Sequence, residues 1–293
     1  MSARTILISG ASGFVGSNLV NYLRKRHKVI AAFNRSVLPF PGVSHTMFSL
    51  TDRNYMKRVF MLFKPDVMIY CAGITDLVDC AKRPQTAEAV NTMGAVALSQ
   101  AADTVPHRLI YLSSAYVYDG KKGNFSEQDV VLPETQFGKG KLAGENFIRA
   151  KISMYTIFRF SPLIGSGSIY HPSVVDQIRM KLQRGEQIEL PQNEVHSFLA
   201  LEAAMQSIEW AATQESRNAT YNLGGLTKLS WYDFGVALAE RLGFDPRLVV
   251  PGKGQMESGG DFSLNGTELI RESEIQPFFL EKSLDLFQQQ LVR

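Results

Sequence analysis

The stretch TILISGASGFVGSNLVNYL, residues 5–23, decides the fold of this chain. Its short apolar start (Thr5–Ser9) is typical of a β-strand, and a helical pattern runs from Val15 to Arg26. Three glycines with GxxGxxG spacing separate them. In such a loop one glycine permits the tight turn, another lets the backbone approach a pyrophosphate, and the third lets helix and strand pack closely. A plain strand-to-helix turn is the alternative, but the position between a strand and a helix favours dinucleotide binding by these residues: Gly10, Ser12, Gly13, Phe14, Val15 and Gly16.

Strand and helix patterns alternate through the next 140 residues. Short apolar runs at residues 29–33, 67–70, 108–113 and 155–160 predict strands, and residues 53–63, 84–104 and 138–150 have helical patterns. The strand runs lack polar alternation, which suits strands that are covered on both faces. The order therefore predicts an α/β fold of the Rossmann type, a doubly wound parallel sheet between layers of helices.

Beyond about residue 160 the pattern loosens. Helices are expected at residues 173–184, 199–213 and 231–242, short strands at 188–190 and 220–223, and a loop at 251–266. We therefore predict a dinucleotide-binding Rossmann domain (residues 1–160) and a smaller C-terminal α/β lobe (161–293) that binds substrate or another ligand. The boundary is approximate, and elements can interleave across it. A cleft between the two parts would lie outside the carboxyl ends of the strands.

Composition excludes several other classes of protein. With 45% hydrophobic residues and a net charge of +3, the chain is neither disordered nor basic enough for a nucleic-acid-binding surface. Its two cysteines cannot form a disulfide framework, and no apolar stretch approaches a membrane span or a signal peptide. We expect a soluble cytoplasmic protein. The five histidines share no metal-ligand spacing, so no metal is predicted.

The end of the second predicted strand bears on cofactor preference. There, an NAD site usually has an acidic residue for the ribose 2′-hydroxyl, whereas an arginine accommodates a 2′-phosphate. This chain has Asn34, Arg35 and Ser36, with no carboxylate. The segment favours NADP(H) over NAD(H), although Arg35 is also consistent with an ordinary solvated surface residue.

Several longer motifs carry a family resemblance over almost the whole chain. They are KPDVMIYCAGITDLVDCAKRP (64–84), AVNTMGA (89–95), LSSAYVYDG (112–120), FGKGKLAGE (137–145) and LSWYDF (229–234). With the glycine loop, they make the chain resemble an extended, atypical short-chain dehydrogenase/reductase of the NAD(P)-dependent epimerase/dehydratase type. More narrowly, the chain is similar to the branch of dTDP-4-dehydrorhamnose reductases and of the regulatory β subunit of methionine adenosyltransferase.

The resemblance implies roles for individual residues. Ser49 and Leu50 would lie beside the adenine, although the family more often has aspartate where Ser49 stands. Asn91 would support the architecture of the site, and Ser114 matches the hydroxyl that binds the substrate carbonyl. Lys141 matches the lysine that binds the nicotinamide ribose and lowers the pKa of a neighbouring tyrosine. The cofactor would also be lined by three residues at the end of a strand: Cys71, Ala72 and Gly73.

The tyrosine of the family's YxxxK motif is missing, because Phe137 stands four residues before Lys141. Ketone reduction needs a hydride and a proton, and a phenol can supply the proton whereas a phenyl ring cannot. Phe137 therefore marks one of three cases. In the first case, the chain is a non-catalytic pseudo-enzyme that still binds dinucleotide for a binding or regulatory role. In the second, it is an active nucleotide-sugar reductase or epimerase in which Tyr116 or Tyr118 supplies the proton. In the third, the substitution is engineered.

A second departure concerns the ligand. The reductase branch has an arginine–proline segment that helps to hold the nucleotide-sugar, but residues 256–261 here (MESGGD) contain no arginine and two carboxylates. A diphosphate would be poorly served by this loop. For Trp231 and Tyr232 two roles are open: they stack on a base or sugar, or they belong to the core. For Arg159 the two roles are contact with substrate and pairing with an interior carboxylate. If the resemblance extends to assembly, helices at 84–104 and 138–150 would form a homodimer, or the chain would join a partner protein in a regulatory role.

Overall fold

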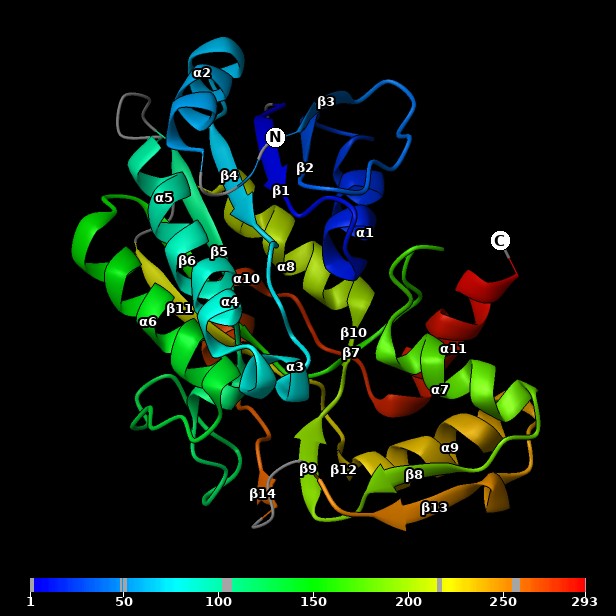
Figure 1. Cartoon of the computed structure of the whole chain (residues 1–293). Helices are drawn as coiled ribbons and strands as arrows, with labels where there is room; N and C mark the ends of the chain where they lie inside the picture. Colours follow the sequence, from blue (N-terminus) through cyan, green and yellow to red (C-terminus); the bar gives the residue numbers. More distant parts are fainter. Residues whose placement is uncertain are drawn as a thin grey trace.

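A seven-stranded parallel sheet dominates the computed structural model, which describes residues 3–47, 49, 52–101, 107–214, 218–254 and 259–292. The strands lie in the order β11-β6-β5-β4-β1-β2-β3 (Figure 1). Their bounds are β1 Thr5–Ser9, β2 Lys28–Phe33, β3 Ser44–Met47, β4 Val67–Tyr70, β5 Arg108–Ser114, β6 Tyr155–Phe160 and β11 Ala219–Leu223. Because β1 pairs with β2 on one side and β4 on the other, the strand order reverses beside β1. A ligand crevice is expected at that reversal.

Helices cover both faces of this sheet, which confirms the predicted doubly wound fold. On one face α1 (Phe14–Leu23) and α8 (Leu201–Thr213) pack over Ile6 and Ile8 of β1. On the other face α2 (Arg53–Phe63), α5 (Gly94–Ala101) and α6 (Gln136–Lys151) pack over Leu7 and its neighbours. Successive side chains of β1 thus enter opposite cores, as strand geometry requires.

The helix predicted over residues 84–104 is interrupted. The structure has α4 (Pro84–Glu88), a π-helical turn η1 (Ala89–Met93) and then α5, and residues 102–106 lie outside the described residues. A separate short helix, α3 (Leu77–Lys82), precedes them. The periodicity predicted helical residues correctly but could not reveal the extra backbone residue of a π turn. Such turns are rare and occur frequently at functional sites.

The C-terminal lobe lies beyond the carboxyl ends of the large sheet (Figure 1). Its core stacks Phe198 on Phe234, with ring centroids 4.2 Å apart. Its helices are α7 (Val174–Gln183), α9 (Trp231–Leu242) and α11 (Leu280–Leu291), with a short turn η3 (Pro246–Leu248). Small sheets pair β7 (Leu163–Ile164) with β10 (Leu199–Ala200), β8 (Ile188–Pro191) with β13 (Val249–Gly252), and β9 (Glu194–Ser197) with both β12 (Lys228–Ser230) and β14 (Gly260–Asp261).

The chain crosses between the two parts after residue 160. α8, β11 and α10 (Thr267–Ser273) return to the large sheet, whereas α7, α9 and α11 stay in the smaller lobe. The stretch 251–266 was predicted as a loop, but it contains the end of β13 and all of β14. Backbone hydrogen bonds then join the parts, from Asp261 N to Gly120 O (2.7 Å) and from Phe125 N to Ser263 O (2.9 Å). Within the described ranges, no helix has the length and apolarity that crossing a membrane requires.

Candidate active site

The glycine loop turns sharply between β1 and α1. Gly10 has a φ of 68°, and a Cβ there would lie 2.8 Å from the Cα of Ala72. A Cβ on Gly16 would lie 2.2 Å from the carbonyl oxygen of Gly10. Gly13 is the N-cap of α1, and no acidic residue lies in the first turn of that helix. The loop therefore presents bare backbone and the positive end of a helix dipole beside the strand-order reversal, which suits a phosphate group.

The residues after β2 face solvent. Asn34, Arg35 and Ser36 are all exposed, and no carboxylate stands among them. Arg35 makes no hydrogen bond or ion pair within the described part of the chain. Its guanidinium is therefore available to a ligand that reaches the carboxyl end of β2. Ser49 is also exposed, and Leu50 lies outside the described residues.

Asn91 holds the segment that follows β4. Its Oδ1 accepts a hydrogen bond from Ile74 N (2.8 Å), and its Nδ2 donates to Ile74 O (2.9 Å). The π-helical turn places this side chain, which is 1% exposed. A Cβ on Gly73 would lie 3.2 Å from Asn91 Oδ1 and 3.6 Å from Lys141 Nζ. The segment after β4, formed by Cys71, Ala72 and Gly73, therefore lies between the glycine loop and the two predicted site residues, Asn91 and Lys141.

Lys141 is buried on α6 and faces β5. Its Nζ donates to the carbonyl oxygen of Leu112 (2.8 Å) and lies 5.1 Å from the centre of the Tyr111 ring. Burial lowers the pKa of Lys141 from 10.5 to about 8, because the charged form loses its hydration. Ser114 ends β5 nearby, and its Oγ accepts a hydrogen bond from Tyr116 N (3.3 Å).

Phe137 lies one helical turn before Lys141 and faces the same way. Its ring is 5% exposed, and its centre is 5.7 Å from Lys141 Nζ. α6 approaches the segment after Ser114 closely, since a Cβ on Gly138 would lie 1.9 Å from Tyr116 O. The structure thus brings Ser114, Phe137 and Lys141 to one corner of the site, and the ring beside the lysine has no ionisable group.

The two tyrosines considered as substitute proton donors point elsewhere. The Tyr116 hydroxyl donates to Oε1 of Glu194 in the C-terminal lobe. The Tyr118 hydroxyl lies 2.9 Å from Ser126 O and 3.1 Å from Asn222 Oδ1, and it accepts a hydrogen bond from Arg159 (2.7 Å). Burial raises the pKa of both tyrosines, and the adjacent Glu194 carboxylate raises that of Tyr116 further. Neither phenol is poised to release a proton at neutral pH.

Sequence reasoning missed Glu145 and left Arg159 open between two roles. Arg159 pairs with Glu145 through two hydrogen bonds of 3.0 and 2.7 Å, and both side chains are almost wholly buried. Glu145 also accepts from Ser113 (2.5 Å) and from Arg149 (2.7 Å). The sequence did contain a signal that could have found Glu145. It follows Lys141 at the spacing of one helical turn, so the two side chains share one face of the helix.

The C-terminal lobe contributes aromatic rings and carboxylates. Trp231 packs edge-on against Phe198, with ring centroids 4.9 Å apart, so it belongs to the lobe's core. In the arginine-free loop, residues 256–258 lie outside the described residues, and Asp261 pairs with Lys228 at 2.6 Å.

Glu194, the partner of Tyr116, was not singled out from the sequence because nothing local distinguishes it. In the described residues no group of three or more His, Cys, Asp or Glu side chains is placed to hold a metal.

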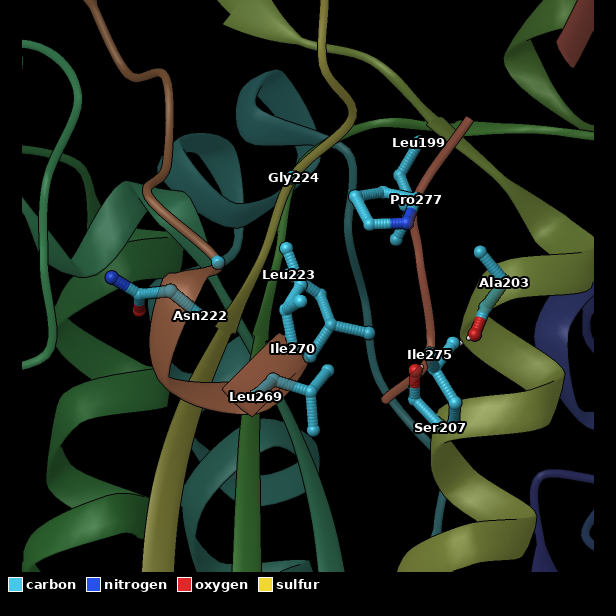
Figure 2. A pocket seen from close by; sticks show the side chains of 11 residues that line it. Leu199, Ala203, Ser207, Asn222, Leu223, Gly224, Leu269, Ile270, Ile275 and Pro277 are labelled. Carbon is cyan, nitrogen blue, oxygen red and sulfur yellow. Dashed lines mark hydrogen bonds between the residues drawn. The ribbon is translucent and has the colours of Figure 1, made fainter. Parts of the chain in front are cut away.

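Figure 2 shows a small hollow between α8, α10 and the end of β11. Its lining is mainly aliphatic, and the Ser207 hydroxyl already donates to Ala203 O (2.8 Å). The hollow offers a ligand little beyond apolar contact.

Replacing Lys141 by methionine is expected to stabilise the protein at pH 7 by about 2 kcal/mol. The shift of the Lys141 pKa from 10.5 to about 8 corresponds to about 3 kcal/mol of destabilisation, from which about 1 kcal/mol is subtracted for the lost hydrogen bond to Leu112. The Lys141 ammonium group holds its proton more tightly in the unfolded state than in the folded state. The stability of the wild-type protein should therefore rise between pH 8 and about 10.5, and the variant, which has no lysine there, should lack this rise. Urea unfolding of both proteins at pH 7 and pH 9.5 checks this; a stability difference that does not shrink with pH would contradict it.

The parallel sheet and its glycine loop define the chain as an extended short-chain dehydrogenase/reductase in fold. Residues 4–257 match the family model described as the RmlD substrate binding domain, and the chain belongs to this family. It is 25% identical over 238 residues to dTDP-4-dehydrorhamnose reductase of Aggregatibacter actinomycetemcomitans, covering 80% of this chain and 77% of that protein. It is 29% identical over 184 residues to methionine adenosyltransferase 2 subunit beta of Bos taurus, covering 61% of this chain and 53%, about half, of that protein.

Solved structures share the fold over nearly the whole chain. A dTDP-4-dehydrorhamnose reductase from Bacillus anthracis str. Ames, in complex with NADP, superimposes with a TM-score of 0.85 at 20% identity and covers 99% of this chain and 100% of that one. UDP-glucose 4-epimerase from Thermotoga maritima, with UDP-glucose, gives 0.87 at 20% identity and covers 98% of both chains. The Bordetella bronchiseptica enzyme WbmH, in complex with NAD+, gives 0.84 at 16% identity and covers 99% of both chains.

Proposed function

We propose that this protein binds NADP(H) and acts as a binding or regulatory member of its family, without the usual reductase chemistry. Phe137 carries the proposal, because its buried ring lies 5.7 Å from Lys141 Nζ, where the family's pattern requires a phenol. A reduced nicotinamide supplies a hydride when bound, and carbonyl reduction also needs a positioned acid. This corner retains Ser114 and Lys141 and has no such acid between them.

Dinucleotide binding is supported by the space that the glycines leave. Side chains at Gly10 or Gly16 would collide with backbone, so the loop keeps close to the helix start and offers amides to a pyrophosphate. The preference for NADP(H) rests on Arg35, which is exposed and unpaired within the described residues and which stands between Asn34 and Ser36 in the sequence. The related fold from Bacillus anthracis contains NADP, and the one from Bordetella bronchiseptica contains NAD+.

The alternative, an active nucleotide-sugar reductase or epimerase with a substitute acid, is less favoured by the contacts of the two tyrosines. Tyr116 donates to Glu194, and Tyr118 lies between Arg159, Asn222 and Ser126. Either hydroxyl would have to leave a buried acceptor to reach a substrate on Ser114. We therefore propose a binding role in the cytoplasm, with residues 1–160 holding the cofactor and residues 161–293 contributing the ligand lobe. A small-molecule ligand and either a homodimer or a regulatory protein partner complete this proposal.

Calorimetry with NADPH and NADH tests the proposed cofactor. Wild-type protein is expected to bind NADPH at least tenfold more tightly than NADH, and Arg35→Ala is expected to remove most of that difference. The loss arises because the guanidinium pairs with the 2′-phosphate, which NADH lacks. Arg184→Ala, a change at the exposed C-cap of α7, is the matched control and should alter neither affinity. Absence of binding by both nucleotides, or equal affinities in the wild type, would refute the proposal.

A further inference from the structure

Two buried tyrosines on neighbouring strands reach the π-helical turn η1. Tyr70 ends β4, and its register partner on β5 is Tyr111. Their ring centroids lie 5.8 Å apart on the face of the sheet that α2, α5 and α6 cover, and both side chains are fully buried. The Tyr70 hydroxyl donates to the carbonyl oxygen of Val90 (2.6 Å), and the Tyr111 hydroxyl donates to that of Asn91 (3.1 Å). Each phenol therefore holds one backbone carbonyl of the turn.

These hydroxyl groups suit the backbone geometry of η1. A π turn inserts an extra residue into a helix and so interrupts the regular i→i−4 ladder of hydrogen bonds. Buried carbonyl groups need hydrogen-bond partners, and a side chain that reaches the interrupted ladder can supply one. Gly144 of α6 leaves room for this arrangement, because a Cβ there would lie 2.5 Å from the Tyr111 hydroxyl oxygen. The two phenols therefore stabilise the π form of the turn.

The direction of the Asn91 side chain depends on this turn. Asn91 accepts a hydrogen bond from Ile74 N and donates one to Ile74 O. Ile74 directly follows Gly73, whose Cβ position lies 3.2 Å from Asn91 Oδ1. At the other end of this segment, a Cβ on Gly10 of the glycine loop would lie 2.8 Å from the Cα of Ala72. The two hydroxyls are thus connected to the predicted cofactor lining through η1 and Asn91.

We infer that Tyr70 and Tyr111 are positioning residues of the dinucleotide site. Their hydroxyls hold η1 in its π form, which directs Asn91 at Ile74 and so fixes residues 71–73 against the glycine loop. Burial raises the pKa of both phenols, so they act as fixed hydrogen-bond donors and not as acids. The inference rests on the proposed function in one respect, since residues 71–73 are taken to line bound NADP(H).

Amide hydrogen exchange, measured by NMR without nucleotide, tests the positioning step. The reporter is Ile74 N, because it donates to Asn91 Oδ1. In the double tyrosine variant, Tyr70→Phe/Tyr111→Phe, this amide should exchange at least tenfold faster than in the wild type. Tyr221→Phe is the matched control, because it also removes the hydroxyl hydrogen bond of a buried tyrosine on a strand of the same sheet. The control should leave the exchange of Ile74 unchanged.

Calorimetric titration with NADPH tests the consequence for the cofactor. The double tyrosine variant should bind NADPH at least tenfold more weakly than the wild type, and Tyr221→Phe should bind it with wild-type affinity. Because the hydroxyls act through Asn91, the losses should not add: in an Asn91→Ala background, the two tyrosine substitutions should weaken binding less than threefold further. A purely structural role would lower the thermal stability of the double tyrosine variant without changing its affinity for NADPH.

Unchanged exchange of Ile74 in the double tyrosine variant would overturn the inference, and so would unchanged NADPH affinity or full additivity with Asn91→Ala. Failure of the proposed cofactor has a different signature: Ile74 exchanges faster in the tyrosine variant, which supports the positioning step, but the wild type binds no NADPH. Thermal unfolding verifies that each variant is folded. If the double tyrosine variant does not fold, Tyr111→Phe alone takes its place, with the same expected direction of change in Ile74 exchange and NADPH affinity.

Discussion

Replacing Phe137 by tyrosine is expected to raise the rate of NADPH-dependent carbonyl reduction by about 10²-fold or more. The ring lies one helical turn before Lys141, with its centre 5.7 Å from Nζ, so a phenol there stands beside a buried cation. The cation favours the phenolate and lowers the tyrosine's pKa, which makes it a better acid. Because the Lys141 pKa is about 8, the lysine is charged and lowers the tyrosine's pKa at neutral pH, and this effect fades as the pH rises above 8.

The measurement is NADPH oxidation under single-turnover conditions, with 4-keto-sugars offered both free and as nucleotide diphosphates. The double variant Phe137→Tyr/Lys141→Met is the control, because it has the phenol without the cation and should recover little of the gain. A different result would favour the alternative function: if Phe137→Tyr changes the rate less than threefold while Tyr116→Phe or Tyr118→Phe abolishes it, a substitute acid already operates.

Truncation of Glu145 to alanine is expected to lower the free energy of unfolding by about 3–5 kcal/mol. Glu145 accepts two hydrogen bonds from Arg159 and one each from Ser113 and Arg149. Arg159 is 2% exposed, so the substitution would leave its charge buried without a carboxylate. Through these bonds Glu145 joins α6, which carries Lys141, to β6 and to β5, which ends at Ser114.

Urea unfolding monitored by tryptophan fluorescence measures the loss in free energy of unfolding. Glu240→Ala on the surface of α9 is the control, and its expected change in that free energy is below about 0.5 kcal/mol. The double variant Glu145→Leu/Arg159→Met should be more stable than Glu145→Ala, because apolar residues of similar volume leave no unpaired charge. Equal stability of the double and single variants would show that packing, and not the uncompensated charge, sets the cost.

Much of the fold was predictable because its signals are local. The strand–glycine–helix order at Thr5–Leu23 involves neighbours in the chain, and the buried strands β1, β4 and β6 have the predicted bounds. The short strands β9 and β14 escaped prediction, since two to four residues carry no periodicity of their own. α10 and α11 were also missed, although α11 has an apolar face formed by Leu284 and Phe287.

By itself, the sequence determined the class of fold, the glycine loop and the loss of the phenol. Phe137 and Lys141 are four residues apart on one helix, so helical geometry alone sets them side by side. Only the tertiary structure decided which groups meet across the chain: Tyr116 with Glu194 and His196, about eighty residues later, and Glu145 with Arg159 on the adjacent strand. Such pairs depend on how the sheet orders its strands and how the second lobe docks, and no local pattern of residues encodes either.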